Sequence, residues 1–294
     1  MYQYQKGKLL FRNEGIIMEL ALIGYPVSHS QSPWIHQRFL NQIKTTGRYQ
    51  LIEIAPDQFE TEIKKMKSMP LIGFNVTIPY KEKIMPYLDE ISADAEEIGA
   101  VNTVVCHNQK WFGYNTDGVG LTTALKTQYP NLFQKDKSVL LLGAGGASRG
   151  IYHALLKEDF ANISIANRTL SRAENVMELN VNNKPGEALS FQEAEQTLDQ
   201  YDLVIQTTSV GMTPNETEQV IDLERLKQGA VVSDIVYQPF LTTLLKSAKE
   251  KGARIHHGHE MLLYQAKLAF ELWTNETVSV EPLIDEFIQM INIK

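Results

Sequence analysis

The chain has 294 residues and a formal net charge of −7 at pH 7, and 43% of its residues are hydrophobic. This length and composition are typical of a globular protein with room for two domains. The negative charge argues against non-specific nucleic-acid binding, and no apolar run reaches the eighteen or so residues of a membrane span. We therefore expect neither nucleic acid nor a membrane as a partner. The single cysteine, Cys106, cannot form an internal disulfide, which fits a cytoplasmic protein.

The first part of the chain alternates between predicted strands and helices. Residues 1–17 show no clear period, and we expect them to be an extension outside the fold. Strands are predicted at 19–23, 49–54, 73–78, 101–106 and 111–114. Helices are predicted from Pro33 and at 59–66, 81–88, 93–98 and 119–129. This alternation predicts an α/β domain.

The second part repeats the alternation. Strands are predicted at 139–142, 162–166, 203–206, 230–235 and 253–255. Helices are predicted at 171–178, 242–251, 260–273 and 280–291. We predict two α/β domains, the second of the Rossmann type, with the C-terminal helices returning to the first domain. The first domain would comprise 18–118 and 258–294, and the second 119–257.

A glycine-rich turn joins the strand at 139–142 to a helix. The turn consists of Gly143, Ala144, Gly145, Gly146 and Ala147. In a dinucleotide-binding turn the first glycine permits the tight bend, and the second lets the backbone approach a pyrophosphate. The helix N-terminus then offers N–H groups to the phosphates. Because Ser148 stands where that pattern has a third glycine, an ordinary strand-to-helix turn is the alternative.

The next strand ends in Asn167, Arg168 and Thr169, and Arg172 follows one helical turn later. An NAD site of this type usually has an acidic residue here, which holds the ribose 2′-hydroxyl. A 2′-phosphate calls for cations and hydroxyl groups instead. The residues therefore favour NADP over NAD, and the alternative is that both arginines are merely solvated.

Hydrogen-bonding side chains gather at predicted strand ends and helix starts. They are Thr77, Lys81, Asn102, Asn115, Thr116, Asp117 and Gln265. Open α/β sheets bind ligands at the carboxyl ends of their strands, and this set suits a small polyol acid better than a flat aromatic ligand. Ser30 and Ser32, at a strand-to-helix turn, could hold its carboxylate. Each residue also has a structural interpretation, since Asp117 or either serine could be an N-cap and Lys81 could be solvated.

Seven motifs, in this order, make the chain resemble the shikimate dehydrogenase family. They are GYPVSHSQSP (24–33), NVTIPYK (75–81), GAVNT (99–103), NTDG (115–118), GAGGA (143–147), NRT (167–169) and MLLYQ (261–265). The family reduces 3-dehydroshikimate to shikimate with NADPH, a step of chorismate and aromatic amino-acid biosynthesis. The resemblance therefore implies an NADP-dependent oxidoreductase.

The resemblance also implies roles in substrate binding and catalysis. Lys81 would be the general acid/base at the C3 oxygen of the substrate, oriented by Asp117. Ser30 and Ser32 would bind the substrate carboxylate. The residues that would hold its hydroxyl groups or lie beside it are Thr77, Lys81, Asn102, Asp117, Tyr237 and Gln265.

On the cofactor side, the resemblance implies that the turn at 143–147 takes the pyrophosphate. The 2′-phosphate would be surrounded by Asn167, Arg168, Thr169 and Arg172, and Ile235 and Gly258 would lie near the nicotinamide. The chain departs from the family's common pattern at His259 and Glu260, which place an ionisable pair near the nicotinamide end.

Alternatives remain at this point. An enzyme of the same fold could oxidise quinate with NAD, although such paralogues tend to be acidic where Arg168 stands. A non-catalytic NADP- or shikimate-sensing protein would be favoured if Lys81 or Asp117 were replaced. His256, His257 and His259 invite a metal site, but no cysteine or carboxylate follows a zinc spacing, so we predict a turn and no metal. We expect a monomer or a homodimer.

Overall fold

The structure, a computed structural model, describes residues 17–292. The predicted extension at 1–17 lies outside the described residues except for Ile17. The chain divides into two compact units. Among the described residues, one unit contains 17–116 and Ala266–Leu283, and the other contains Asp117–Gln265 and 284–292. Residues 258–265 and the chain end thus group with the second unit, where the Phe287 ring stacks 6.2 Å from that of His259.

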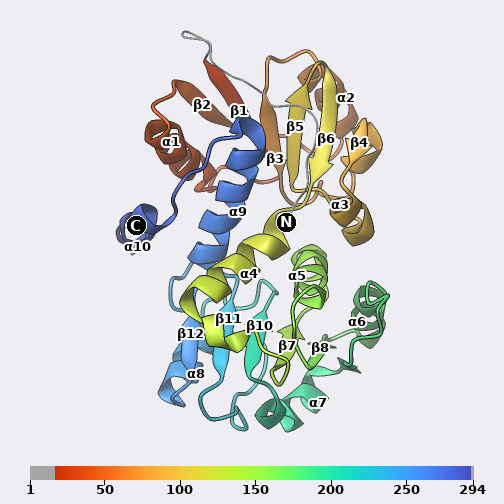
Figure 1. The fold of residues 1–294 in the computed structure, drawn as a ribbon, viewed down its shortest axis with the longest axis vertical. Helices are drawn as coiled ribbons and strands as arrows, with labels where there is room; N and C mark the ends of the chain where they lie inside the picture. The colour runs from red at the N-terminus through yellow and green to blue at the C-terminus, as the bar shows by residue number, and fades with distance from the viewer. Residues whose placement is uncertain (1–16, 293–294) are drawn as a thin grey trace. The chain divides into compact units, whose positions relative to one another are not determined.

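The first unit is built on a six-stranded mixed sheet in the order β2-β1-β3-β5-β6-β4 (Figure 1). Its strands are β1 (Met18–Gly24), β2 (Gly47–Glu53), β3 (Gly73–Val76), β4 (Glu90–Ile91), β5 (Thr103–His107) and β6 (Lys110–Tyr114). Its helices are α1 (Ser32–Gln42), α2 (Phe59–Met66), α3 (Ala93–Ile98) and the 3-10 turn η1 (Met85–Tyr87). Because β1 and β3 pair in parallel, their carboxyl ends lie at the same edge of the sheet. That edge leads into the motifs at 24–33 and 75–81.

Aromatic packing fixes the far end of α9 (Gly258–Thr274) on this sheet. A Cβ on Gly73 would lie 2.1 Å from the Trp273 ring, so the indole rests directly on the strand. Its Nε1 donates to the Val104 carbonyl at 2.9 Å. A fully buried indole with a satisfied N–H combines a large apolar contact with a directional one.

The second unit carries a parallel sheet of six strands in the order β12-β11-β10-β7-β8-β9 (Figure 1). Its strands are β7 (Ser138–Leu142), β8 (Asn162–Ala166), β9 (Ala188–Leu189), β10 (Leu203–Gln206), β11 (Val231–Asp234) and β12 (Arg254–His256). Its remaining elements are α4 (Asp117–Gln128), α5 (Gly146–Leu156), α6 (Leu170–Met177), α7 (Phe191–Gln196), α8 (Thr243–Glu250), η2 (Pro130–Leu132) and η3 (Leu198–Gln200); α10 (Glu281–Asn292) lies across the division between the units. The chain order of the strands reverses between β7 and β10, which is the switch point where such sheets bind ligands. The predicted α/β class with a Rossmann-type half is confirmed.

Glycines let α4 come very close to two other helices of the second unit. A Cβ on Gly118 would lie 1.9 Å from the Gly150 carbonyl oxygen on α5. A Cβ on Gly120 would lie 2.7 Å from the backbone nitrogen of Gln265 on α9. Backbone-to-backbone packing of this kind leaves no room for a side chain. It holds the start of α4, and with it Asp117, in a fixed place relative to Gln265.

The helix predicted over 81–88 is wrong in type and extent. Residues 81–84 form turns, and only Met85–Tyr87 is helical, as a 3-10 turn. Pro86 lacks the N–H that a longer α-helix would need at that point. Helix α7 and the strands β4 and β9 are additional to the predicted elements.

The longest helix described, α9, has 17 residues. Within residues 17–292, no helix is both long enough and apolar enough to cross a bilayer.

Candidate functional site

The glycine turn after β7 combines one glycine that the fold requires with two that face open space. Gly143 has a φ of +111°, and a Cβ there would lie 2.7 Å from Thr207 Oγ1. A Cβ on Gly145 or Gly146 would meet nothing within 4 Å. The backbone at these two positions is therefore accessible to a group as large as a phosphate, as a dinucleotide-binding turn requires.

Ser148, at the position of the third glycine, stabilises the turn through its side chain. Its side chain is fully buried, and its Oγ donates to the Gly143 carbonyl at 2.7 Å. Helix α5 has Gly145 as its N-cap, and no side chain within the described residues caps it. The N–H groups of its first turn and the positive end of its dipole thus remain available to an anion.

Cationic side chains follow β8, the strand next to β7. Arg168, Thr169 and Arg172 are exposed, and the Asn167 amide donates to the Thr169 carbonyl at 2.8 Å. Neither guanidinium forms an ion pair within residues 17–292. On a chain with a net charge of −7, two exposed arginines without carboxylate partners suit a phosphate dianion.

Ile235 and Gly258, both assigned to the nicotinamide end, lie against each other in the second unit. A Cβ on Gly258 would lie 2.4 Å from the Ile235 carbonyl oxygen, so the backbones touch. Tyr237, two residues beyond Ile235, is half-buried, and its ring lies 6.5 Å from that of Phe287. Burial raises the pKa of the Tyr237 phenol, so the phenol is protonated at neutral pH and can donate a hydrogen bond.

In the first unit, Ser30 and Ser32 pair with each other rather than capping a helix. Ser30 Oγ donates to Ser32 Oγ at 3.1 Å and accepts from the Ser32 backbone N–H at 3.2 Å. The N-cap of α1 is Gln31, and the described part of the chain offers it no capping side chain. The pair of hydroxyl groups at this helix start suits a carboxylate ligand.

Asn102 is buried and its amide orientation is set by its neighbours. Its Oδ1 accepts from the Thr116 backbone N–H at 2.9 Å and from Thr103 Oγ1 at 2.8 Å. Its Nδ2 donates to Thr116 Oγ1 at 2.9 Å. Because a backbone N–H can only donate, Oδ1 must face Thr116 and Nδ2 must face the Thr116 hydroxyl.

Thr77 and Lys81 lie in the turn that follows β3. Both are half-buried. The Lys81 carbonyl accepts from the Val101 N–H at 2.8 Å, which ties the turn to the residue before Asn102. The Thr77 N–H donates to the Ile23 carbonyl at 2.9 Å, which ties the same turn to the end of β1. The predicted substrate residues of the first unit are thus held at one edge of its sheet.

Asp117 and Gln265 belong to the second unit. Asp117 is buried and is the first residue of α4. The alternative interpretation, an N-cap of a helix that begins at Val119, is therefore wrong. Gln265 is half-buried and its Nε2 donates to the Leu262 carbonyl at 2.9 Å. That bond uses one N–H of the amide and leaves Oε1 and the second N–H as further hydrogen-bonding capacity.

Of the three neighbouring histidines, His256 and His259 are buried and His257 is half-buried. His256 is fully buried with Nδ1 2.9 Å from Ser233 Oγ, and His257 Nδ1 lies 2.8 Å from the Phe240 carbonyl. Burial lowers the pKa of His256 to about 3 and that of His259 to about 4. Glu260 is also buried, and burial raises the pKa of its carboxyl to about 7. The departure from the family pattern at His259 and Glu260 therefore lies inside the protein rather than in solvent.

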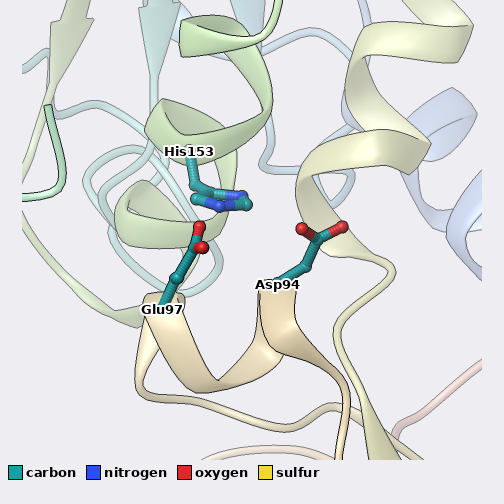
Figure 2. A group of neighbouring side chains, drawn as sticks. All are labelled: Asp94, Glu97 and His153. Atoms are coloured by element: carbon teal, nitrogen blue, oxygen red, sulfur yellow. The ribbon is translucent and has the colours of Figure 1, made fainter. Parts of the chain in front are cut away.

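Figure 2 shows acidic and imidazole side chains that belong to no sequence motif. Asp94 and Glu97 project from α3 in the first unit, and His153 projects from α5 in the second, where it is buried. Each of the three side chains offers one atom that could ligate a metal ion.

Two buried polar residues at strand ends, Gln206 and Asp234, are not among the predicted site residues. Burial raises the pKa of Asp234 to about 6. The sequence does contain a signal for them, because each is a polar residue at the end of a mostly apolar strand in the predicted cofactor-binding domain.

Three protein-family models match the chain. The shikimate dehydrogenase substrate binding domain matches residues 22–104, and the shikimate/quinate 5-dehydrogenase model matches residues 126–237. The C-terminal domain of shikimate 5′-dehydrogenase matches residues 258–285.

Individual relatives agree with these models. A protein of Oceanobacillus iheyensis named shikimate dehydrogenase (NADP(+)) is 53% identical over 90% of this chain and 94% of its own length. A crystal structure of a shikimate dehydrogenase in complex with NADP+ has a TM-score of 0.86 and 36% identity, covering 94% of this chain and 96% of that one. The Thermus thermophilus shikimate 5-dehydrogenase in complex with NADP(H) and shikimate has a TM-score of 0.81 and 30% identity, covering 90% and 96%.

Proposed function

The chain belongs to the shikimate dehydrogenase family, and from this we propose that it catalyses the reversible, NADPH-dependent reduction of 3-dehydroshikimate to shikimate. The observation that carries the proposal is the extent of the likeness, which covers 90% of the chain at 53% identity. A Rossmann-type half alone would indicate only a dinucleotide. Here the likeness includes the half that carries Ser30, Thr77 and Lys81. The reaction belongs to chorismate and aromatic amino-acid biosynthesis.

On the substrate side, the hydroxyl pair of Ser30 and Ser32 would bind the carboxylate. Asn102 would hold a ring hydroxyl group. Thr77, Tyr237 and Gln265 would complete the set of hydrogen-bonding groups. These contacts would orient the substrate so that its C3 carbon faces the cofactor, which is the main contribution positioning makes to catalysis.

Lys81 would hold the proton that moves to and from the C3 oxygen, with Asp117 orienting its ammonium group. A positive donor within hydrogen-bond reach stabilises the negative charge that develops on a carbonyl oxygen during reduction and then supplies the proton. NADPH, when bound, supplies the hydride.

The second unit would bind NADP(H). The open backbone at Gly145 and Gly146 and the N-terminus of α5 suit the pyrophosphate, with Gly143, Ala144 and Ala147 in the same turn. Arg168 and Arg172, with Asn167 and Thr169, suit the 2′-phosphate. Ile235 and Gly258 would lie at the nicotinamide end.

The domain roles follow from the same proposal. Residues 18–118 and 258–294 would form the substrate-binding domain, which is supported by the family model over 22–104, and 119–257 would form the NADP-binding domain. The cytoplasmic location and the monomeric or dimeric state stay predictions.

The decisive experiment follows NADP(H) absorbance at 340 nm with shikimate or quinate, each paired with NADP+ or NAD+. We expect shikimate with NADP+ to be the fastest pairing. If quinate with NAD+ is converted as fast as shikimate with NADP+, the protein is better described as an NAD-dependent quinate dehydrogenase. No turnover in any pairing, together with measurable NADPH binding, would favour a sensing protein. A Lys81→Ala preparation, purified in the same way, controls for contaminating dehydrogenases.

A further inference from the structure

A buried amide and a buried carboxyl face each other at the ends of β10 and β11. Gln206 and Asp234 are the last paired residues of these parallel strands, and they are 1% and 0% exposed. Gln206 Nε2 donates to Asp234 Oδ1 at 3.2 Å. A carboxyl buried this deeply is tolerated only when its hydrogen bonds are made, so its partners indicate what it does.

The Gln206 amide holds the segment that follows β10. Its Oε1 accepts from the Thr208 backbone N–H and from Thr208 Oγ1, and its Nε2 also donates to the Val210 carbonyl at 3.0 Å. Between them, Thr207 Oγ1 donates to the Leu142 carbonyl at 2.8 Å and lies against Gly143. One side of the network therefore reaches the glycine turn.

The Asp234 carboxyl holds the segment that follows β11. Its Oδ1 accepts from the Val236 backbone N–H at 2.9 Å, and its Oδ2 accepts from Thr242 Oγ1 at 2.7 Å. The carbonyls of Ile235 and Val236 in this segment lie 2.4 and 2.6 Å from where a Gly258 Cβ would stand. The other side of the network therefore reaches the Ile235–Gly258 contact.

We propose that Asp234, through Gln206, is a positioning residue that sets the separation between the glycine turn and the Ile235–Gly258 contact; this inference rests on the proposed NADP-binding function. The glycine turn follows β7 and Ile235 follows β11, and β10 lies between these two strands (Figure 1). A ligand that must touch both ends gains its full affinity only when their separation matches its own length. Asp234 is buried, so it acts through the segments that it holds.

The test compares the whole cofactor with a fragment of it. In the full chain, Asp234→Ala should weaken NADPH binding by about 10-fold or more, because the nicotinamide end loses its fixed place. Adenosine 2′,5′-bisphosphate, which has the 2′-phosphate but no nicotinamide, should bind within about 2-fold of wild type, because its end is unchanged. Asp234→Asn should restore NADPH affinity to within about 3-fold, since its Oδ1 can still accept from Val236 and Gln206 and its amide can donate to Thr242. Both affinities can be read by fluorescence titration or calorimetry.

Ser233→Ala is the matched control. Ser233 is fully buried on the same strand and its Oγ lies 2.9 Å from His256 Nδ1, so its loss removes a buried hydrogen bond without touching either segment. We expect a lower melting temperature and unchanged NADPH affinity. The inference is overturned if Asp234→Ala leaves NADPH affinity unchanged, or weakens NADPH and the bisphosphate by the same factor.

Two further comparisons keep the test decisive. If Asp234→Ala does not fold, Thr242→Val is compared with Thr242→Ser, using the same two ligands. The valine variant removes the hydroxyl group that donates to Asp234, and the serine variant keeps it. If the wild type oxidises shikimate with NADP+ but neither set of variants weakens NADPH more than the bisphosphate, this inference alone fails. If the wild type does not bind NADPH, the proposed function fails and this inference with it.

Discussion

Lys81 is the residue whose loss should remove turnover without removing binding. Lys81→Ala should lower kcat by ~10²–10⁴ with a modest change in the KM for shikimate, the range expected for a lost positioned acid/base. Steady-state kinetics at 340 nm measure both constants. Lys83→Ala is the matched control, because Lys83 is exposed two positions away. Near-normal turnover of Lys81→Ala would exclude the assigned role.

Arg168 is the residue on which the cofactor preference should depend. Its guanidinium is exposed and forms no ion pair within residues 17–292, so its charge is available to a ligand. Arg168→Ala should weaken NADPH by ~1.5–3 kcal/mol, as for a lost hydrogen bond to a charged group, and should change NADH affinity little. Calorimetric titration with both cofactors measures this difference. Arg225→Ala, an exposed arginine of the same unit beside Asp199, should change neither, and an equal loss for NADPH and NADH would rule out a 2′-phosphate contact.

Glu260 should give folding stability an unusual pH dependence. Its pKa is raised to about 7 from the usual 4.5, so the folded state holds the proton more tightly than the unfolded state does. The ionised, buried carboxylate therefore destabilises the fold fully above pH 7, and this cost is relieved as pH falls from 7 towards 4.5. Buried His256 and His259 have pKa values lowered from 6.5 to about 3 and 4. They stay neutral in the folded state but take up protons in the unfolded state below pH 6.5, so they oppose the Glu260 trend in the wild type and in a Glu260 variant alike.

Glu260→Gln should consequently be more stable than wild type at pH 8, by up to about 3 kcal/mol, and the difference should shrink at pH 5. Urea unfolding at the two pH values measures it. Glu250→Gln on α8, which is exposed, should show no such trend. A stability difference for Glu260→Gln that is the same at both pH values would contradict the assignment.

In the strand–turn–helix unit from β7 to α5, a substitution in the turn should weaken NADPH binding without lowering the stability of the fold. Gly145→Ala places a methyl group in space free of protein atoms, with φ and ψ of −98° and −171° that alanine adopts readily. We expect an unchanged melting temperature and NADPH binding weakened by about 10-fold or more, because the methyl group occupies the approach of the pyrophosphate.

Gly118→Ala is the opposite case and serves as the contrast. Its Cβ would lie 1.9 Å from the Gly150 carbonyl oxygen, so α4 and α5 must separate, at a cost of about 1–3 kcal/mol or more. Thermal denaturation and NADPH titration of both variants test the pair. Equal losses of stability in the two variants would show that the turn has no free space.

Some helices and strands can be predicted from the sequence and others cannot, and the difference has a physical cause. Helices α2 and α3 have the predicted bounds, 59–66 and 93–98, because amphipathic spacing and end signals are local. Strands β4 and β9 have two residues each and exist only through pairing with β6 and β8. Helix α7 did have a local signal, since Ser190 and Glu193 form a capping box.

The same division holds for the candidate site. The sequence motifs predict that the site residues lie at strand ends and helix starts. In the second unit, the glycine turn does lie at the end of β7, at the switch point of the sheet. The partners of those residues are not local. The bond from the Thr116 N–H to Asn102 Oδ1 joins positions 14 apart, and Gln206 meets Asp234 across 28 positions through strand pairing. Such contacts depend on sheet register, which no single segment encodes.

At the scale of the whole molecule, the leading residues should be dispensable. Strand β1 begins at Met18, and the family model for the substrate-binding domain begins to match at residue 22. A chain starting at Met18 should therefore retain kcat and both KM values within about 2-fold and the same melting temperature, because the buried core that stabilises a domain lies within its packed elements. Kinetics and calorimetry on the purified full-length and shortened chains measure this. Loss of activity or solubility on shortening would mean that residues 1–17 contribute to the folded enzyme, and alanine substitution of Leu9, Leu10 and Phe11 in the full chain would then locate the contribution.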